Sequence, residues 1–248
     1  MSLLAAQRRG RGSLLGQLCG DALGAPFVGR AAREIAADHP QGLGEMLGDP
    51  ARGLAPGQGT EASELTLALA RTLASEGGYE AERVAAAYVA WHRSGPRAPR
   101  PALELAFAGF PGTPSLADGL SARADKETRC SAGLLRSGPL ALLGWRLPPD
   151  ELGGWAARDA RLSHPHPLCR HAAVLYTFAI ATALRREDLD GAGVYAETLS
   201  FARERRWVPE LLADLEGASE DLPAEAGEGE DPEDGDPEDG DPEDGDPE

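Results

Sequence analysis

Three oxygen-bearing side chains stand together at the start of a predicted helix in the stretch GQGTEASELTLALA, residues 57–70. Thr60, Glu61 and Ser63 offer hydroxyl and carboxylate oxygens, which are ligands that Mg²⁺ prefers in proteins. Ligands this close in sequence can share an ion only where the backbone turns sharply, and the two glycines before them permit such a turn. Ala62 interrupts the set. The stretch therefore indicates a metal-binding turn that lacks one ligand, with N-capping of the helix as the alternative role of Thr60.

A second group of side chains that could do chemistry is His164, His166, Cys169 and His171. Zinc prefers histidine and cysteine ligands. In a helix that follows the second proline of this segment, Cys169 and His171 would lie about 200° apart, at ~100° per residue. Since they cannot converge on one ion, the group does not predict a zinc site. His164 can instead have a structural role, as a hydrogen-bonded histidine at the start of a helix.

Helical spacing of apolar residues dominates the elements that must position these groups. No convincing period-two strand is present, and Phe, Trp and Tyr together make up only 5% of the chain. The sequence therefore predicts an all-α bundle of many short to medium helices. The predicted helices span residues 13–24, 61–75, 79–93, 102–107, 133–144, 149–161, 167–184, 190–204 and 208–215.

The net charge of -17 lies entirely in the C-terminal part of the chain. From Glu216 onward there are 17 acidic and no basic residues, so residues 1–215 hold 24 acids and 24 bases. We expect a helical domain over 1–215 and a disordered, solubilising tail of DPEDG repeats over 216–248. An EF-hand calcium loop is not predicted, because Pro232 occupies a ligand position. The neutral domain and acidic tail make nucleic acid an unexpected partner.

Cysteine usage and hydropathy bear on the compartment. Three widely spaced cysteines do not make a disulfide framework, which favours a reducing cytosol. The N-terminal leucines are interrupted by arginines, so no signal peptide is predicted, and no stretch was expected to span a bilayer. We therefore expect a cytoplasmic protein with no membrane partner, and with Cys19 and Cys169 in its core.

Four segments, in order, resemble the ADP-ribosylglycohydrolases. GSLLGQLCGDALGAPF (12–27) resembles their opening helix, and residues 57–70 resemble their glycine turn ending in Thr-Asp-Asp-Thr. SAGLLRSGPLAL (131–142) is similar to their Asn-Gly-x-x-Met-Arg segment, and DARLSHPHPLCRHAAVLY (159–176) to their Thr-His-Pro-x-Pro helix entry. The resemblance covers roughly residues 10–200. It implies a compact all-α orthogonal bundle that hydrolyses the glycosidic bond between ADP-ribose and a protein side chain, with a pair of Mg²⁺ ions in its cleft.

The resemblance also assigns roles to individual residues. The implied metal ligands are Thr60, Glu61 and Ser63, and Glu61 is the implied catalytic carboxylate. The implied substrate contacts are Asp21, Ser131 and His164. Asp21 has an alternative structural role in capping or salt bridging, and Arg136 is expected to bind carbonyls or a carboxylate. Because the glycine turn and the His-Pro entry flank one pocket in the family, Thr60, Glu61 and His164 should share a concave surface.

Departures from the family pattern affect the metal site. Val28 stands where the family has Glu, and Ala62 stands where it has the second Asp. Nothing after residue 180 resembles the family's late Gly-x-Asp-Thr-Asp-Thr turn. Two hypotheses follow: a working ADP-ribosylglycohydrolase, or a relative with weak or absent Mg²⁺-dependent catalysis that binds ADP-ribosyl groups, a nucleotide or a partner protein. We expect Mg²⁺ binding to be weak or absent.

Overall fold

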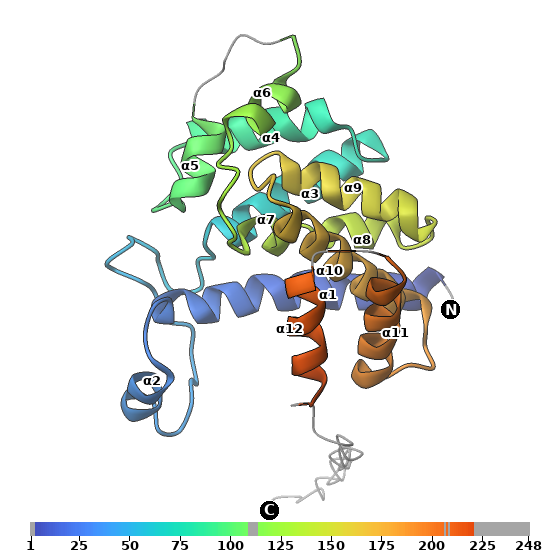
Figure 1. The fold of residues 1–248 in the computed structure, drawn as a ribbon. Helices are drawn as coiled ribbons and strands as arrows, with labels where there is room; N and C mark the ends of the chain where they lie inside the picture. The colour runs from blue at the N-terminus through green and yellow to red at the C-terminus, as the bar shows by residue number, and fades with distance from the viewer. Residues whose placement is uncertain (1–2, 109–113, 206, 208, 221–248) are drawn as a thin grey trace, which may run out of the picture.

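A computed structural model describes residues 3–108, 114–205, 207 and 209–220. These residues form helices joined by turns, and within them the only β pairing is an isolated antiparallel bridge between Asp49 and Leu54. The elements are α1 (Leu3–Gly24), η1 (Ala25–Phe27), α2 (Ala32–Asp38), α3 (Glu61–Glu76), α4 (Ala81–Arg93), α5 (Pro101–Phe107), α6 (Leu116–Arg123), α7 (Ala132–Leu135), α8 (Gly138–Gly144), α9 (Pro149–Arg161), α10 (Pro167–Arg185), α11 (Gly191–Glu204) and α12 (Pro209–Glu220). In the view of Figure 1, α3 to α9 lie above the long helix α1, whereas α2, α11 and α12 extend below it.

Helix α10 lies at the centre of the fold, packed against α7, α8, α9 and α11. By length and composition alone it could cross a membrane, which corrects the expectation that no stretch could. Half of its most apolar window is buried inside the protein. An apolar helix whose surface is covered by neighbouring helices is the usual core element of a folded domain.

Helices α3 and α4 pack together and supply a large part of the core. Leu65, Leu69 and Leu73 recur at four-residue spacing on α3, so they lie on one face, and all three are buried. From α4, Trp91 donates its indole N–H to Glu64 Oε2 at 2.6 Å. The three buried leucines fix the rotation of α3 about its axis, and hence the direction in which its first turn faces.

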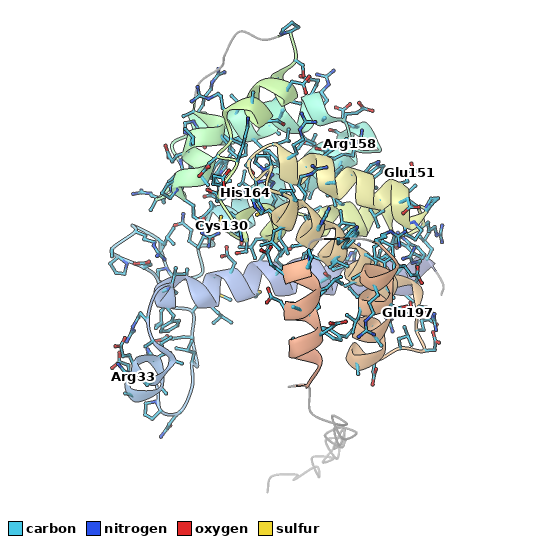
Figure 2. All side chains as sticks on the ribbon, in the orientation of Figure 1. Arg33, Cys130, Glu151, Arg158, His164 and Glu197 are labelled. Atoms are coloured by element: carbon cyan, nitrogen blue, oxygen red, sulfur yellow. The ribbon has the colours of Figure 1, made fainter. Side chains whose placement is uncertain are left out.

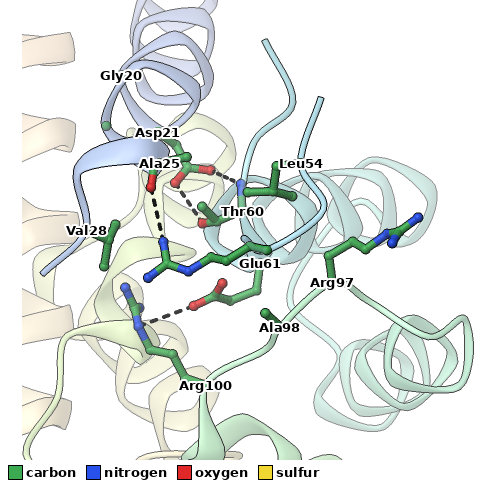
Figure 3. A pocket seen from close by; sticks show the side chains of 12 residues that line it. Gly20, Asp21, Ala25, Val28, Leu54, Thr60, Glu61, Arg97, Ala98 and Arg100 are labelled. Carbon is green, nitrogen blue, oxygen red and sulfur yellow. Dashed lines mark hydrogen bonds and ion pairs between the residues drawn. The ribbon is translucent and has the colours of Figure 1, made fainter. Parts of the chain in front are cut away.

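Helix α1 contacts α3, α8 and α10 along its length but buries few of its own residues. Ala22 and Ala25 are buried near its C-terminal end, where the chain turns into η1. Cys19 is exposed, which corrects the expectation that it lies in the core, whereas Cys169 is buried as expected. The C-terminal end of α1 lies beside the first turn of α3, so two segments far apart in sequence meet there (Figure 3).

The predicted all-α class is confirmed. Most predicted helices agree with the structure to within one or two residues at each end, and α9 has the predicted bounds. The predicted segment 133–144 is two helices that break at Arg136 and Ser137, which agrees with the boundary or kink expected near Pro139. Helices α2 and α6 and the first turns of α1 were not predicted. Helix α12 continues to Glu220, past the predicted domain boundary, and the predicted acidic tail beyond it lies outside the described residues.

Candidate functional site

The turn before α3 has the sharp geometry that its glycines permit. Gly57 adopts φ +77°, in the left-handed region that favours glycine. At Gly59 the constraint is space, because a Cβ there would lie 2.5 Å from Ser63 Oγ and 2.9 Å from Asp21 Oδ2. Thr60 then caps α3, with its hydroxyl oxygen accepting from the Ala62 N–H at 3.2 Å. The N-capping role considered for Thr60 is therefore present.

Asp21, near the end of α1, binds the first turn of α3 through both carboxylate oxygens. Oδ1 accepts from the Thr60 hydroxyl at 2.7 Å, and Oδ2 accepts from the Thr60 N–H at 2.7 Å. Oδ2 also accepts from the Ser63 hydroxyl at 2.6 Å and from the Ser63 N–H at 3.3 Å. A carboxylate at this position satisfies the free N–H groups of the helix start and complements its positive dipole end. Asp21 thus has the capping role considered for it.

Glu61 is held by a different partner. Its side chain is only 7% exposed, and Oε1 lies 3.3 Å from Nε of Arg100, whose side chain is 36% exposed. Figure 3 shows the two side chains facing each other below Thr60 and Asp21. Arg100 is the N-cap residue of α5, so it reaches Glu61 from a different segment than Asp21 of α1 does. One candidate metal ligand is therefore paired with a cation from the protein itself.

These groups border a cavity of about 260 Å³ between the end of α1, the loop before α3 and the segment before α5. Its lining residues are Gly20, Asp21, Gly24, Ala25, Val28, Arg52, Leu54, Thr60, Glu61, Arg97, Ala98 and Arg100. Val28 contributes an apolar side chain to this wall. The fold therefore brings Asp21, Thr60 and Glu61 to one cavity, with Ser63 buried directly behind Asp21.

His164 does not share this concave surface, contrary to expectation. Its side chain is fully buried and is not among the residues that line the cavity. Nδ1 lies 2.8 Å from Ser163 Oγ, and Nε2 lies 3.0 Å from Cys130 Sγ. Figure 2 shows His164 and Cys130 next to each other, and Cys130 is half-buried. A contact between His164 and ADP-ribose stays a prediction, whereas its role as a hydrogen-bonded histidine at a helix entrance is present.

The hydrogen bonds around His164 engage both ring nitrogens. Arg136 Nη1 donates to Ser163 Oγ at 2.7 Å, and Ser163 Oγ in turn bonds His164 Nδ1. The neutral imidazole donates at one ring nitrogen and accepts at the other, and either tautomer satisfies Ser163 and Cys130. Burial, together with the positive charges of Arg136 and Arg100, lowers the pKa of His164 to about 3. The imidazole is consequently neutral at physiological pH.

Arg136 anchors this buried network, as expected for a structural arginine. Its Nε lies 2.9 Å from Asp159 Oδ2, and its Nη2 donates to the Asp159 carbonyl at 2.8 Å. Tyr88 donates its hydroxyl to Asp159 Oδ1 at 2.7 Å, and its ring lies under the guanidinium. The charge of Arg136 is met by a buried carboxylate, and each of its three guanidinium nitrogens has a hydrogen-bond partner. Arg136 is positioned for structure rather than for ligand binding.

Ser131 lies apart from the cavity. It is exposed at the start of α7, makes no capping bond with its side chain, and is not a lining residue. Its predicted contact with substrate stays a prediction. The charged lining residues that sequence reasoning missed are Arg52, Arg97 and Arg100. They lie in segments rich in glycine and proline without helical periodicity, so no sequence signal placed them at the cavity.

No group of three or more His, Cys, Asp or Glu side chains suited to a metal ion is present in the part of the chain that the structure describes. The Thr60 and Ser63 hydroxyls both donate to Asp21, so three oxygen-bearing side chains satisfy one another. Glu61 is the remaining carboxylate, and it faces Arg100. The arrangement can orient the start of α3 and place guanidinium groups beside a small cavity.

Comparisons with known proteins agree with this fold. A family model described as ADP-ribosylglycohydrolase matches residues 3–239. ADP-ribosyl-(dinitrogen reductase) glycohydrolase of Rhodospirillum rubrum is 30% identical over 162 residues, which are 64% of this chain and 52% of that protein. A solved structure titled ADP-ribosylglycohydrolase-related protein complex matches with a TM-score of 0.66 and 25% sequence identity. The match covers 87% of this chain and 68% of the chain in that structure. This chain therefore spans about half the length of the curated relative that it matches.

Proposed function

Because this chain belongs to the ADP-ribosylglycohydrolase family, we propose that it retains the family's scaffold with weak or absent Mg²⁺-dependent hydrolysis of ADP-ribosyl groups. Its ligand would be ADP-ribose or an ADP-ribosylated protein. The relative from Rhodospirillum rubrum carries a glycohydrolase name, but this chain corresponds to only 52% of that protein. The proposal therefore depends on the chemistry of this chain's own cavity.

The observation that carries the proposal is the pair formed by Glu61 and Arg100. A hard dication needs several anionic or neutral oxygens in near-octahedral geometry. Glu61 is 7% exposed and its Oε1 is 3.3 Å from a guanidinium nitrogen. A Mg²⁺ ion bound to Glu61 would lie close to this second positive charge, and repulsion between like charges opposes its binding. The Arg100 guanidinium already places beside Glu61 the positive charge that a metal ion would otherwise provide.

The other candidate ligands fit a Mg²⁺ pair no better. Asp21 accepts four hydrogen bonds from Thr60 and Ser63, which engage both of its oxygens. Three of these bonds go to Oδ2 and one to Oδ1, so Asp21 keeps at most one lone pair, on Oδ1, for a metal. Neither Ala62 nor Val28 has a side-chain oxygen to offer. The donor set of these residues therefore does not fit the metal pair that the family implies, and we derive no catalytic step through it.

A working enzyme with altered metal use is the competing candidate. It would require Glu61 to leave Arg100 when substrate arrives, so that its carboxylate could orient a water or a metal. Family membership favours this candidate, whereas the self-satisfied side chains favour the proposal. The two differ in a single observable, which is turnover that depends on Glu61.

The test is release of ADP-ribose from ADP-ribosylated arginine and serine peptides, with Mg²⁺ and with EDTA. The parent, Glu61→Ala and a matched control, Glu76→Ala at the other end of α3, are assayed together. We expect turnover near the uncatalysed level for all three proteins in both conditions. Mg²⁺-dependent turnover that Glu61→Ala abolishes and Glu76→Ala preserves would overturn the proposal.

A further inference from the structure

Two guanidinium groups lining the cavity beside Glu61 have a geometry suited to an anion. Arg100 uses Nε for Glu61, while its Nη1 is buried and has no hydrogen-bond partner among the described residues. A buried donor without an acceptor is costly, and an oxyanion entering the cavity would supply the acceptor. This unpartnered nitrogen indicates that the residues around the cavity do not complete it by themselves.

Arg52 approaches the same cavity from the loop before α3. Its Nη1 donates to the Ala25 carbonyl at 3.1 Å and lies 3.3 Å from Asp49 Oδ2. These contacts hold the guanidinium in place at the end of α1, so little side-chain entropy remains to be lost when it binds a ligand. Arg52 and Arg100 therefore present pre-positioned forks from two separate segments.

Arg97 is the third arginine on the lining, but it belongs to the rim. Its Nη1 rests over Gly53, and Figure 3 shows the side chain directed away from Glu61 and Arg100. Between the two arginines, Ala98 adopts φ +41°, which is unfavourable for a residue with a Cβ. Such backbone persists only where its surroundings fix it, and Ala98 lies on the cavity lining two residues before Arg100.

We propose that this cavity binds a phosphoryl oxyanion, such as a pyrophosphate group, on Arg52 and Arg100 without a divalent cation. Guanidinium forks match the geometry of phosphate oxygens and form strong, charge-assisted hydrogen bonds. At about 260 Å³ the cavity is slightly smaller than the ~300–1,000 Å³ typical of sites that enclose a drug-sized ligand. It therefore suits the phosphoryl part of a ligand rather than a whole nucleotide sugar.

This inference rests on the proposed function, since it assigns a ligand class to the same metal-deficient site. It also predicts how Glu61 affects binding of the anion. A carboxylate beside the bound oxyanion repels it, so neutralising Glu61 should strengthen binding. If a metal bridged the anion to the protein, Glu61 would be a ligand of that metal and neutralising it would weaken binding. The sign of the effect of Glu61→Gln thus separates the two arrangements.

The experiment is isothermal titration of the full chain in EDTA with inorganic pyrophosphate, with ADP-ribose, and with adenosine as the neutral control. We expect pyrophosphate and ADP-ribose to bind and adenosine not to bind. Arg100→Gln and Arg52→Gln should each weaken binding about tenfold. Arg146→Gln, the control at an exposed arginine outside the cavity, should change it less than about twofold. Glu61→Gln should tighten it. If ADP-ribose binds more tightly than pyrophosphate, the bound phosphoryl group belongs to a nucleotide sugar. If pyrophosphate binds more tightly, the ligand is the free anion.

Absence of pyrophosphate binding in EDTA would overturn the inference, as would binding that Arg52→Gln and Arg100→Gln both leave unchanged in folded proteins. Circular dichroism establishes folding, and Arg100→Lys, which keeps the charge but loses the fork, gives a second variant at that position. These failures are distinct from failure of the proposed function. Mg²⁺-dependent turnover would refute the proposed function even if pyrophosphate bound in EDTA, and missing pyrophosphate binding would leave the turnover result unaffected.

Discussion

The Arg100 guanidinium and the Glu61 carboxylate join α5 to α3 across the cavity, with Nε 3.3 Å from Oε1. Glu61 is the first residue of α3 and Arg100 is the N-cap residue of α5. Neither residue belongs to an apolar helix face, so hydrophobic packing alone does not position their side chains. The pair brings an intramolecular cation to a carboxylate that the family resemblance assigns to metal binding. Its strength therefore bears on both stability and metal binding.

A double-mutant cycle with Glu61→Gln and Arg100→Gln should show that the pair is coupled. We expect a coupling free energy of about 1 kcal/mol from urea unfolding. This is the upper end of the range for exposed pairs, because Glu61 is buried while Arg100 remains partly solvated. The coupling should decrease in 1 M salt. The control cycle is the exposed pair Arg203 and Glu216, where we expect a value close to zero. Equal coupling in the two cycles would contradict this account.

Asp21→Ala should destabilise the protein more than loss of an ordinary helix cap. The substitution removes a carboxylate that accepts four hydrogen bonds and joins α1 to α3. We expect a loss of about 2 kcal/mol, at the upper end for cap substitutions. Asp190→Ala is the matched control, since Asp190 caps α11 locally through Gly193 N–H, and it should cost about 1 kcal/mol. Chemical unfolding of both variants measures the two losses of stability. Asp21→Ala must lose more unfolding free energy than Asp190→Ala, and the reverse order would contradict the account.

Gly59→Ala should destabilise the turn because its new methyl group would lie 2.6 Å from Ser63 Cβ. The helix start or α1 must shift to accommodate it, which we expect to cost about 1–3 kcal/mol. Gly16→Ala in α1 is the opposite case, since nothing lies within 4 Å of its added Cβ. Alanine there should stabilise the helix by up to about 1 kcal/mol. Thermal unfolding that gives both substitutions the same sign would refute the close packing at Gly59.

His164 should make stability fall as the solution becomes acidic. Its folded-state pKa of about 3 lies below the ordinary value of 6.5, so the unfolded chain binds more protons as pH falls below 6.5. The stabilising contribution of the neutral imidazole is present above pH 6.5 and decreases toward pH 3. Between pH 6.5 and 5 we expect a loss of about 2 kcal/mol from this group.

The measurement is the free energy of unfolding against pH for the parent, His164→Asn and His39→Gln. Only His164→Asn should flatten the acid side of the profile, whatever its effect on stability at neutral pH. An unchanged slope in His164→Asn would show that the buried histidine titrates normally.

The parts of the fold that followed from sequence are those with a local cause. Helix α3 was predicted because Leu65, Leu69 and Leu73 repeat at helical spacing, and that repeat is visible without any tertiary contact. Helix α6 was missed because it is short and follows a proline-rich stretch. The break at Ser137 also has a local signal, because Pro139 stands in the first turn of α8 and proline favours a helix start.

The candidate site divides in the same way. Thr60 and Glu61 were predicted because a glycine turn and a helix start are local features, and Asp21 joined them through the family resemblance. Arg52 and Arg100 reach the cavity from loops, and His164 is buried by long-range packing against Cys130 and Ser163. Loop conformation and burial depend on contacts between distant segments, so the sequence pattern could not specify these positions.

Titration of the full chain with Mg²⁺ by calorimetry tests the central claim most directly, because it measures whether Glu61 is available as a metal ligand. The account predicts a dissociation constant no tighter than on the order of 1 mM for the parent, with tighter binding in Arg100→Gln, where the competing positive charge is gone. Mg²⁺ binding by the parent at least tenfold tighter than this, lost in Glu61→Ala and retained in Glu76→Ala, would contradict it.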